Sequence, residues 1–199
     1  MTVELLPKII LQKYMVREWQ HACAILQNDF KAEWEDIIAL LTQFKLCKSW
    51  VVEAGGRKSK VSEFIDSFLY SRGWEEKQFN TALHVDDQTM ASPTHKVDCY
   101  KNRIALEIEW NNKDPFFDRD LNNFRLLFDL RAISVGIIIT RSDELQEIFD
   151  NLGRGKSYGN STTHMSKLLP RIEGGGGAGC PILVIGMKKG LYNKEVENG

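Results

Sequence analysis

The chain has 199 residues, of which 43% are hydrophobic and 27% charged, and its formal net charge is −1. This length and apolar content can bury a sizeable core, so they exclude a disordered chain and predict one domain over residues 1–199. No apolar run approaches the roughly 18 residues that a membrane-spanning helix needs, so no membrane partner is expected. The near-zero charge neither favours nor excludes a nucleic-acid partner, because phosphate contacts depend on local charge.

The N-terminus and the cysteines together predict a cytoplasmic protein. The opening segment, MTVELLPKIILQKYMV, has an early acid and neither a cationic leader nor a small-residue cleavage site, so no signal peptide is expected. The cysteines are far apart and form no CxxC pair, which argues against a zinc site and for reduced thiols. They are Cys23, Cys47, Cys99 and Cys180.

The first 50 residues are expected to be a helical N-terminal part. Between residues 14 and 45, apolar side chains such as Trp34, Ile37 and Leu41 recur at helical spacing, with a break near Asn28 and Asp29. A further helix is predicted to begin at Ser62, which can cap its N-terminus, and to end at Gly73.

The rest of the chain predicts strands that alternate with helices. Residues 96–110 have the pattern of a hairpin, and Asp114 and Pro115 open a helix that runs to about residue 130. The other predicted elements are a weak strand at 78–85, a buried strand at 133–140, a helix at 142–152, a long polar segment at 153–179 and a strand at 181–187. This order predicts an α/β fold with a central mixed β-sheet flanked by helices.

Three acids are placed where a hairpin would bring them together. Glu107 and Glu109 lie at positions i and i+2 of the second hairpin strand, so both side chains point to the same face. Asp98 precedes Glu107 by nine residues. If the turn is centred between Asn102 and Arg103, Asp98 pairs directly with Glu107, and the three carboxylates converge on one patch.

Converging carboxylates repel one another, and a hard cation with oxygen ligands relieves that repulsion. Magnesium takes one or two protein carboxylates and fills its other positions with water and phosphate oxygens. A metal so held polarises a phosphodiester and activates a water for attack. The pattern therefore indicates phosphodiester hydrolysis, although the same alternation is also typical of an edge hairpin whose acids face water.

The spacing Asp98-x8-Glu107-x-Glu109 resembles the PD-(D/E)xK nuclease signature. More closely, residues 97–112, VDCYKNRIALEIEWNN, are similar to the corresponding block of the BglII and BstYI group of restriction enzymes, which have Asp-x8-Glu-x-Gln followed by an aromatic residue. The likeness covers roughly residues 60–187, including the helix around Glu63 and the last strand, GAGCPILVIG. The first 50 residues match only as generic helices.

The resemblance implies a single nuclease domain with a restriction-endonuclease-like catalytic core at residues 60–187. It also implies a homodimer that binds double-stranded DNA and cuts both strands of a short, palindromic site. Asp98 and Glu107 would be ligands of Mg²⁺, with Mn²⁺ able to substitute.

Two catalytic assignments depart from the nearest relatives or stay open. Glu109 replaces their Gln, and the Lys of the general signature, but related BamHI-type enzymes have a Glu there that is proposed as the base for the attacking water. That role is carried over to Glu109, with activation of the water without a protein base as the alternative. Glu63 is expected as an upstream acid from a helix, or else as a solvated first-turn glutamate.

Two segments are expected to contact DNA. Asn111, Asn112 and Lys113 follow Trp110, where the BglII-like enzymes place residues at base edges, and Asn can bond adenine in the major groove. A polar turn is the alternative for this segment. The second segment is rich in donors and acceptors, with a flexible linker as its alternative. Its candidate residues are Arg154, Lys156, Tyr158, Asn160, Ser161, Thr162, Thr163 and His164.

The sequence therefore predicts a magnesium-dependent type II restriction endonuclease. One alternative is another PD-(D/E)xK nuclease that acts in repair or junction resolution. A second is a catalytically inactive DNA-binding module, against which the intact set of acids argues. A third is an α/β domain whose acids merely face water.

Overall fold

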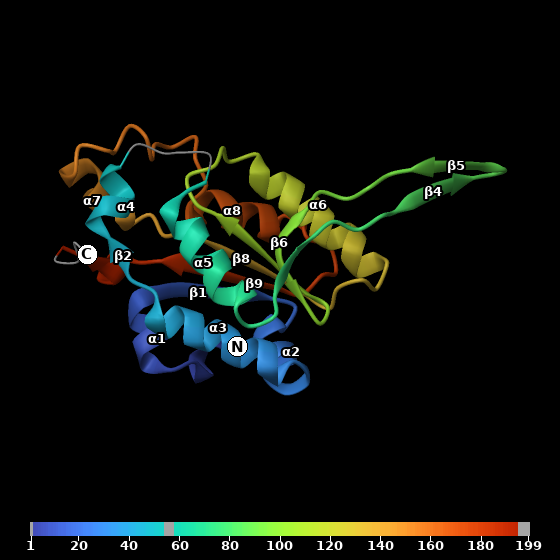
Figure 1. The fold of residues 1–199 in the computed structure, drawn as a ribbon, viewed down its shortest axis with the longest axis horizontal. Helices are drawn as coiled ribbons and strands as arrows, with labels where there is room; N and C mark the ends of the chain where they lie inside the picture. The colour runs from blue at the N-terminus through green and yellow to red at the C-terminus, as the bar shows by residue number, and fades with distance from the viewer. Residues whose placement is uncertain (1, 54–57, 195–199) are drawn as a thin grey trace.

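The computed structural model describes residues 2–53 and 58–194, with a mixed six-stranded sheet at their centre (Figure 1). The strand order is β1–β9–β8–β7–β6–β3; β7, β8 and β9 run parallel, and the other neighbours pair antiparallel. These strands are β1 (Tyr14–Trp19), β3 (Glu75–Lys77), β6 (Val97–Lys101), β7 (Ile104–Glu109), β8 (Val135–Arg141) and β9 (Ile182–Met187). The predicted α/β fold with a flanked mixed sheet is confirmed.

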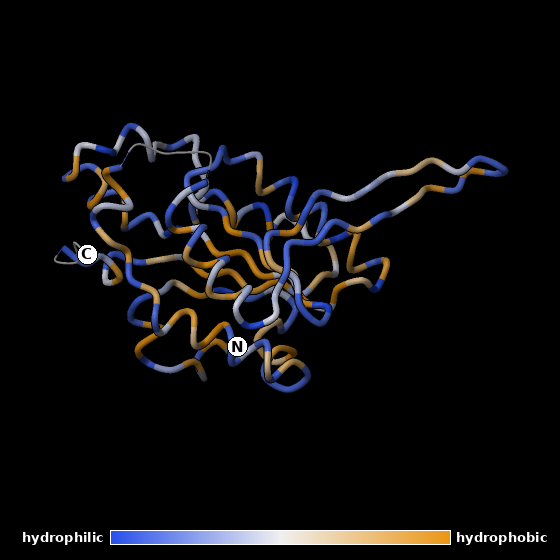
Figure 2. Tube along the Cα trace, in the orientation of Figure 1, coloured by the Kyte–Doolittle hydropathy of each residue, from blue (hydrophilic) through white to orange (hydrophobic). Residues whose placement is uncertain are grey.

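Helices cover both faces of this sheet. One apolar cluster joins one face to the helices α1 (Lys8–Lys13), α2 (Ala22–Asp29), α3 (Lys31–Gln43), α4 (Lys48–Val52), α5 (Lys60–Tyr70) and α7 (Leu145–Asn151). A second cluster joins the opposite face to α6 (Phe116–Asp129) and α8 (Met165–Glu173). β7 and β8 are therefore buried along their whole length, and Figure 2 shows the apolar centre that results.

The predicted hairpin is confirmed, and so is its register. Cys99 pairs with Leu106 and Lys101 with Ile104, and continuing that register sets Asp98 opposite Glu107. The turn residues Asn102 and Arg103 have φ values of 44° and 68°, as in the type I′ turns that suit the twist of two-residue hairpins.

The N-terminal prediction is wrong for residues 14–19, which form strand β1 rather than a helix. Tyr14 and Val16 are buried while the residue between them is half-buried, which is the two-residue period of a strand. Antiparallel pairing with β9 decides the outcome, because the sequence YMVREW lacks the strict apolar and polar alternation that would have indicated a strand. The two helices expected after it are present, with Phe30 between them.

Several boundaries also differ from the prediction. The cap of α5 is Ser59, whose hydroxyl accepts a 3.0 Å hydrogen bond from the Ser62 amide, so the helix begins earlier than expected. Pro115 rather than Asp114 precedes the first residue of α6. The segment 153–179 contains helix α8, which its polar, glycine-rich composition concealed.

A two-stranded arm leaves the sheet between β3 and β6 (Figure 1). It consists of β4 (Ala82–Val85) and β5 (Gln88–Ala91), which pair only with each other. The remaining elements are the short pair β2 (Leu46–Cys47) and β10 (Tyr192–Asn193) and the 3-10 turns η1 (Thr2–Leu5) and η2 (Lys189–Leu191). Within the described residues, no helix is both long and apolar enough to cross a bilayer.

Candidate active site

Glu107 and Glu109 lie inside the protein. Their side chains occupy the same face of β7 as Ala105, which belongs to the apolar cluster beneath α6, and the two residues are only 1% and 2% exposed. β7 is a central strand, with β6 on one side and β8 on the other. The alternative of an edge hairpin with its acids in water is therefore excluded.

Asp98 lies directly beside Glu107, as the register requires. The amide of Asp98 donates a 3.3 Å hydrogen bond to Glu107 Oε2. The amide of Ile108 donates a 2.9 Å bond to Asp98 Oδ2. These contacts hold the two carboxylates in fixed positions, one on each strand of the hairpin.

Helix α6 adds a fourth acid that sequence reasoning missed. Asp120 is fully buried, and Arg119 donates to its Oδ1 from Nε at 2.9 Å and from Nη2 at 2.8 Å. The signal was present in the sequence, because Asp120 interrupts the stripe of Phe117, Leu121 and Phe124 on the buried side of the helix. An acid on such a stripe is a departure that calls for a polar partner.

Arg119 and Asn112 both contact Glu109. Arg119 Nη2 lies 3.3 Å from Glu109 Oε1, and Asn112 Nδ2 donates to Oε2 at 2.9 Å. Phe116 supports the guanidinium, which lies 4.4 Å from the centre of its ring. Glu109 is therefore held by the Arg119 guanidinium and the Asn112 side-chain amide. The Asn112 side chain thus contacts the site and does not point only to solvent.

Burial, together with the proximity of these acids to one another, favours their protonated forms. Burial, then the charges of Asp120 and Asp98, raise the pKa of Glu107 well above its ordinary range. Burial, with Asp120 adding to it, raises the pKa of Glu109 to about 9. Burial raises the pKa of Asp98 to about 6, although the Ile108 amide opposes the shift. The site therefore lacks compensating positive charge for the full set of carboxylates.

A cleft of about 420 Å³ opens over the site and is lined by residues from five segments of the chain. Its polar lining includes Asp66, Glu76, His95, Asp98, Glu109 and Arg119. The cleft is lined by acids that can hold a metal ion and by cations that can contact an anion bound to that ion.

The cleft contains Asp66 of α5, and Glu63 does not line it. The Glu63 carboxylate is 44% exposed and pairs with Lys60 at 2.9 Å. Asp66 is buried, contacts Lys58 and accepts a 3.4 Å hydrogen bond from the Cys99 thiol. Both acids lie on the expected helix, but only Asp66 falls among its buried residues. That position, beside Ile65 on the apolar stripe, could have identified it.

The donor set fits a magnesium ion. Two buried carboxylate oxygens, Glu107 Oε1 and Asp120 Oδ2, have no hydrogen-bond partner within the part of the chain that the structure describes, and a divalent cation would satisfy such atoms. Within residues 2–53 and 58–194, no three acids, histidines or cysteines are gathered as a complete metal site. Magnesium needs only one or two protein carboxylates when phosphate and water supply the other positions.

The two segments expected to contact DNA lie side by side at the end of β7. The Thr163 amide donates to the carbonyl of Asn112 at 2.9 Å, the Asp114 amide donates to the carbonyl of Ser161 at 3.1 Å, and Lys113 forms a β-bridge with Thr162. Residues about 50 positions apart therefore form one surface beside the acids.

Four of the candidate loop residues are buried and hold the loop in place. Tyr158 stacks on Phe149 with ring centres 4.0 Å apart, and the Arg141 guanidinium bonds both the Tyr158 carbonyl and the Thr162 hydroxyl. Thr163 donates to the carbonyl of Glu109 at 3.1 Å. The His164 ring lies 2.9 Å from the Asp143 carboxylate.

The other candidates remain available to a ligand. Lys113, Lys156, Asn160 and Ser161 are exposed, and Asn111, Asn112 and Arg154 are partly exposed. Among the described residues, the buried Oδ1 of Asn111 has no hydrogen-bond partner, and Asn111 adopts a positive φ of 60°. The loop thus separates buried side chains that shape it from exposed side chains that a ligand can contact.

A mixed sheet whose central hairpin brings buried acids to an open cleft defines the restriction-endonuclease-like class of nucleases. The sequence model of one family, Restriction endonuclease BglII/BglIII, matches residues 14–187, which is most of the chain. The chain belongs to this family, and it is a nuclease that acts on DNA. Among curated proteins, no relative matches the chain.

The raised pKa values predict how stability depends on pH and on magnesium. The folded-state pKa values of Asp98 and Glu109, about 6 and about 9, exceed the unfolded values of about 4. The acids therefore favour the fold when protonated, and this contribution is lost as pH rises through 6 and then 9. In EDTA, the melting temperature of wild type is expected to fall, relative to that of Asp98→Asn/Glu109→Gln, between pH 5 and pH 9.

Adding Mg²⁺ at pH 8 is expected to raise the melting temperature of wild type and to have little effect on Asp98→Asn/Glu107→Gln. Differential scanning fluorimetry measures both effects, with Glu75→Gln as a control, because that carboxylate is exposed and lies on the neighbouring strand β3. An equal Mg²⁺ response in the double variant would show that the ion binds elsewhere.

Proposed function

We propose that the protein is a magnesium-dependent type II restriction endonuclease that acts as a homodimer and cuts both strands of a short palindromic DNA site. The observation that carries this proposal is the contact of Asp98, which lines the cleft, with Glu107, one of whose buried oxygens has no hydrogen-bond partner among the described residues. Membership of the BglII/BglIII family supports cleavage of DNA. The palindrome and the homodimer rest on the resemblance to that group.

Asp98 and Glu107 are the proposed ligands of Mg²⁺, with Mn²⁺ as a substitute. When bound there, the metal supplies positive charge to the scissile phosphate and lowers the pKa of a water molecule. The two residues contribute by presenting oxygens whose positions are fixed by backbone amides. Because the cost of bringing the carboxylates together is met in the folded protein, little rearrangement is needed when the phosphate arrives.

Glu109 is the proposed acceptor of the proton from the attacking water. The water oxygen forms a bond to phosphorus while the bond from phosphorus to the leaving oxygen breaks. The water proton moves to a Glu109 oxygen, and the leaving oxygen keeps the electron pair of the broken bond and takes a proton from solvent water. For this role Glu109 must be deprotonated, and Arg119 and Asn112, which donate to its two oxygens, favour that form. Activation of the water without a protein base remains the alternative.

Base reading is proposed for the surface that combines residues 111–113 with the exposed part of the loop at 154–161. Asn160 and Ser161 offer neutral donors and acceptors for base edges, and Lys113 and Lys156 offer charge for phosphates. The continuity of this surface with the catalytic strand supports the assignment.

The proposal predicts the loss of cleavage in Asp98→Asn and in Glu107→Gln, with the fold retained. Purified protein incubated with plasmid and Mg²⁺ should give discrete fragments for wild type and for Glu75→Gln, and none for the two variants. Their melting temperatures should equal or exceed that of wild type, because a buried repulsion is removed. Structure-dependent nicks would indicate a repair or junction enzyme instead, and normal cutting by either variant would refute the metal site.

The two acids of α5 give a matched comparison. Asp66→Asn is expected to lower cleavage by roughly 10–100-fold, as supporting residues of metal sites do, because Asp66 lines the cleft beside Asp98. Glu63→Gln is expected to cut as wild type does, because its carboxylate pairs with Lys60 outside the cleft. Cleavage rates at several Mg²⁺ concentrations measure the effect. The reverse order of the two variants would restore Glu63 as the upstream acid.

Asn160→Ala is expected to reduce the preference for the cognate site by about 1–3 kcal/mol, the contribution of a good base contact. Gel-shift titrations with cognate and scrambled duplexes in Ca²⁺ measure it, once fragment ends have defined the site. Ser157→Ala, an exposed change in the same loop, is the control. Equal losses on both duplexes would assign Asn160 to phosphate contact rather than base reading.

A further inference from the structure

The β4–β5 arm exposes an apolar face that no other part of the described chain covers. All of its strand residues are exposed, and Leu83, Val85 and Met90 are exposed to 55%, 55% and 50%. Leu83 pairs with Met90 and Val85 with Gln88, so the three apolar side chains share one face. The other face has Ala82, Ala91 and the hydrogen-bonded pair of His84 and Thr89.

Such an arm needs a partner. An isolated two-stranded hairpin is only marginally stable in water, and an exposed apolar face invites association. Figure 1 shows the arm extending well beyond the sheet and the helices. Its apolar side chains are therefore placed where another molecule can cover them.

The charge of the arm argues against DNA as that partner. There is no lysine or arginine between Lys77 and Lys96, and the tip contains Asp86 and Asp87. Neither aspartate forms an ion pair within the described residues. A DNA backbone would repel this tip, because binding to DNA depends on neutralising phosphates with cations.

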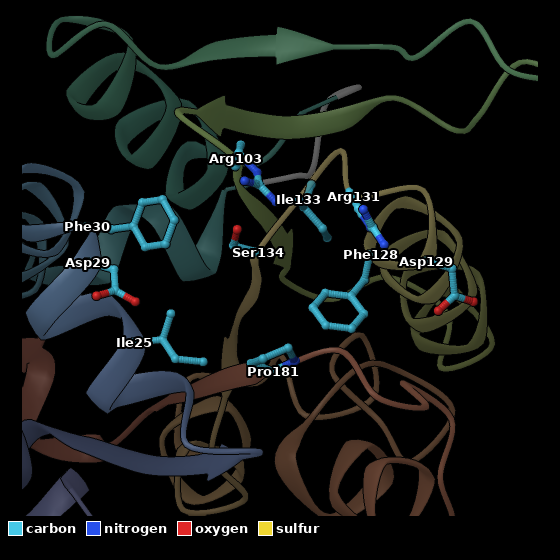
Figure 3. Close-up of a pocket in the computed structure, with 10 residues that line it drawn as sticks. All are labelled: Ile25, Asp29, Phe30, Arg103, Phe128, Asp129, Arg131, Ile133, Ser134 and Pro181. Carbon is cyan, nitrogen blue, oxygen red and sulfur yellow. The ribbon is translucent and has the colours of Figure 1, made fainter.

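A complementary surface lies at the opposite end of β7 and β8 from the acids. It surrounds a cavity of about 680 Å³ with apolar walls formed by Ile25, Phe30, Phe128, Ile133 and Pro181 (Figure 3). Next to the cavity, α6 exposes Leu126 and, one turn later, Leu130 follows the helix. The lining of this cavity, with Leu126 and Leu130 beside it, is the basal cavity.

The basal cavity also contains the cations that the arm lacks. Arg103 and Arg131 line it, both are exposed, and neither forms an ion pair within residues 2–53 and 58–194. Asp29 and Asp129 line it too, but Figure 3 places them on opposite sides, with the arginines between them. The lining holds two arginines and two aspartates, so the match with the arm lies in the apolar walls and in the placement of the arginines, and not in a net positive charge.

We propose that the arm of one protomer docks in the basal cavity of a second copy of this chain. Leu83, Val85 and Met90 would cover the apolar wall, and Asp86 and Asp87 would pair with Arg103 and Arg131. In a two-fold symmetric dimer, the arm of each protomer would fill the basal cavity of the other, so the same contact would form twice. The inference rests on the proposed homodimer and assigns a surface to it.

The first test is the dimerisation affinity of the full chain, measured by sedimentation velocity over a range of concentrations without DNA or Mg²⁺. Leu83→Ser, on the apolar face, is expected to weaken dimerisation roughly tenfold or more, as the loss of a buried anchor does. Ala82→Ser, on the opposite face of the same strand, is expected to leave it unchanged. A Leu83→Ser dimer as tight as wild type, or one impaired only in DNA binding, would overturn the proposal.

The second test traps the contact. The Asp87→Cys and Arg131→Cys variants are prepared separately, mixed and oxidised, and the background should be low because all four native cysteines are buried. A disulfide-linked dimer is expected from the mixture and not from either variant alone. No cross-link from the mixture, or an equal one from Asp87→Cys alone, would overturn arm-to-cavity docking.

The outcomes separate this inference from the proposed function. A wild-type dimer without the cross-link removes the arm contact and leaves the homodimer. A wild-type protein that stays monomeric at every concentration removes both, and neither result bears on whether Asp98 and Glu107 support cleavage.

Discussion

The main constraint on the structure is the electrostatic repulsion among carboxylates that the fold brings together. Asp98, Glu107, Glu109 and Asp120 come from two strands and a helix, and three of them are almost completely buried. Arg119 compensates part of their charge, and two of the carboxylate oxygens have no hydrogen-bond partner in residues 2–53 and 58–194. Removing charge from water is costly, so such a cluster persists only where the surrounding core is strong enough to hold it. Here the parallel strands β7 and β8, covered on both faces, provide that rigidity.

The same repulsion explains why the site is built at the hairpin rather than on loops. Direct pairing across β6 and β7 fixes two acids through backbone geometry, and the positive-φ turn at Asn102 and Arg103 sets the register. A shift of one residue would move Asp98 away from Glu107 to the other face of the sheet. The geometry of the candidate site is therefore a consequence of strand register, with the packing of α6 adding Asp120.

Much of this arrangement could be predicted from the sequence. Strict alternation over Ile104–Glu109 and the nine-residue spacing from Asp98 to Glu107 predicted the hairpin and its three acids, because residues that alternate between two faces indicate a strand. Asp66 and Asp120 required knowledge of which helix face is buried, and that depends on tertiary contacts. Strand β1 was missed because its sequence, YMVREW, does not alternate strictly between apolar and polar residues, and its partner β9 lies more than 160 positions away. Helix α8 was hidden in a segment whose glycines and polar residues are typical of loops.

The loop that joins α7 to α8 has buried side chains that hold it in place and exposed side chains that can be exchanged, and this difference has an evolutionary consequence. Its inward side chains, Tyr158, Thr162 and Thr163, contact Phe149, Arg141 and strand β7, whereas Lys156, Asn160 and Ser161 are exposed. Exchanges at outward positions such as Lys156 and Asn160 should change folding stability by less than about 0.5 kcal/mol, as exposed changes usually do. Such a scaffold can acquire new contacts by drift at its outer residues while the chemistry beneath stays intact. If this loop reads bases as proposed, related chains would diverge in the DNA they recognise through a few tolerated replacements.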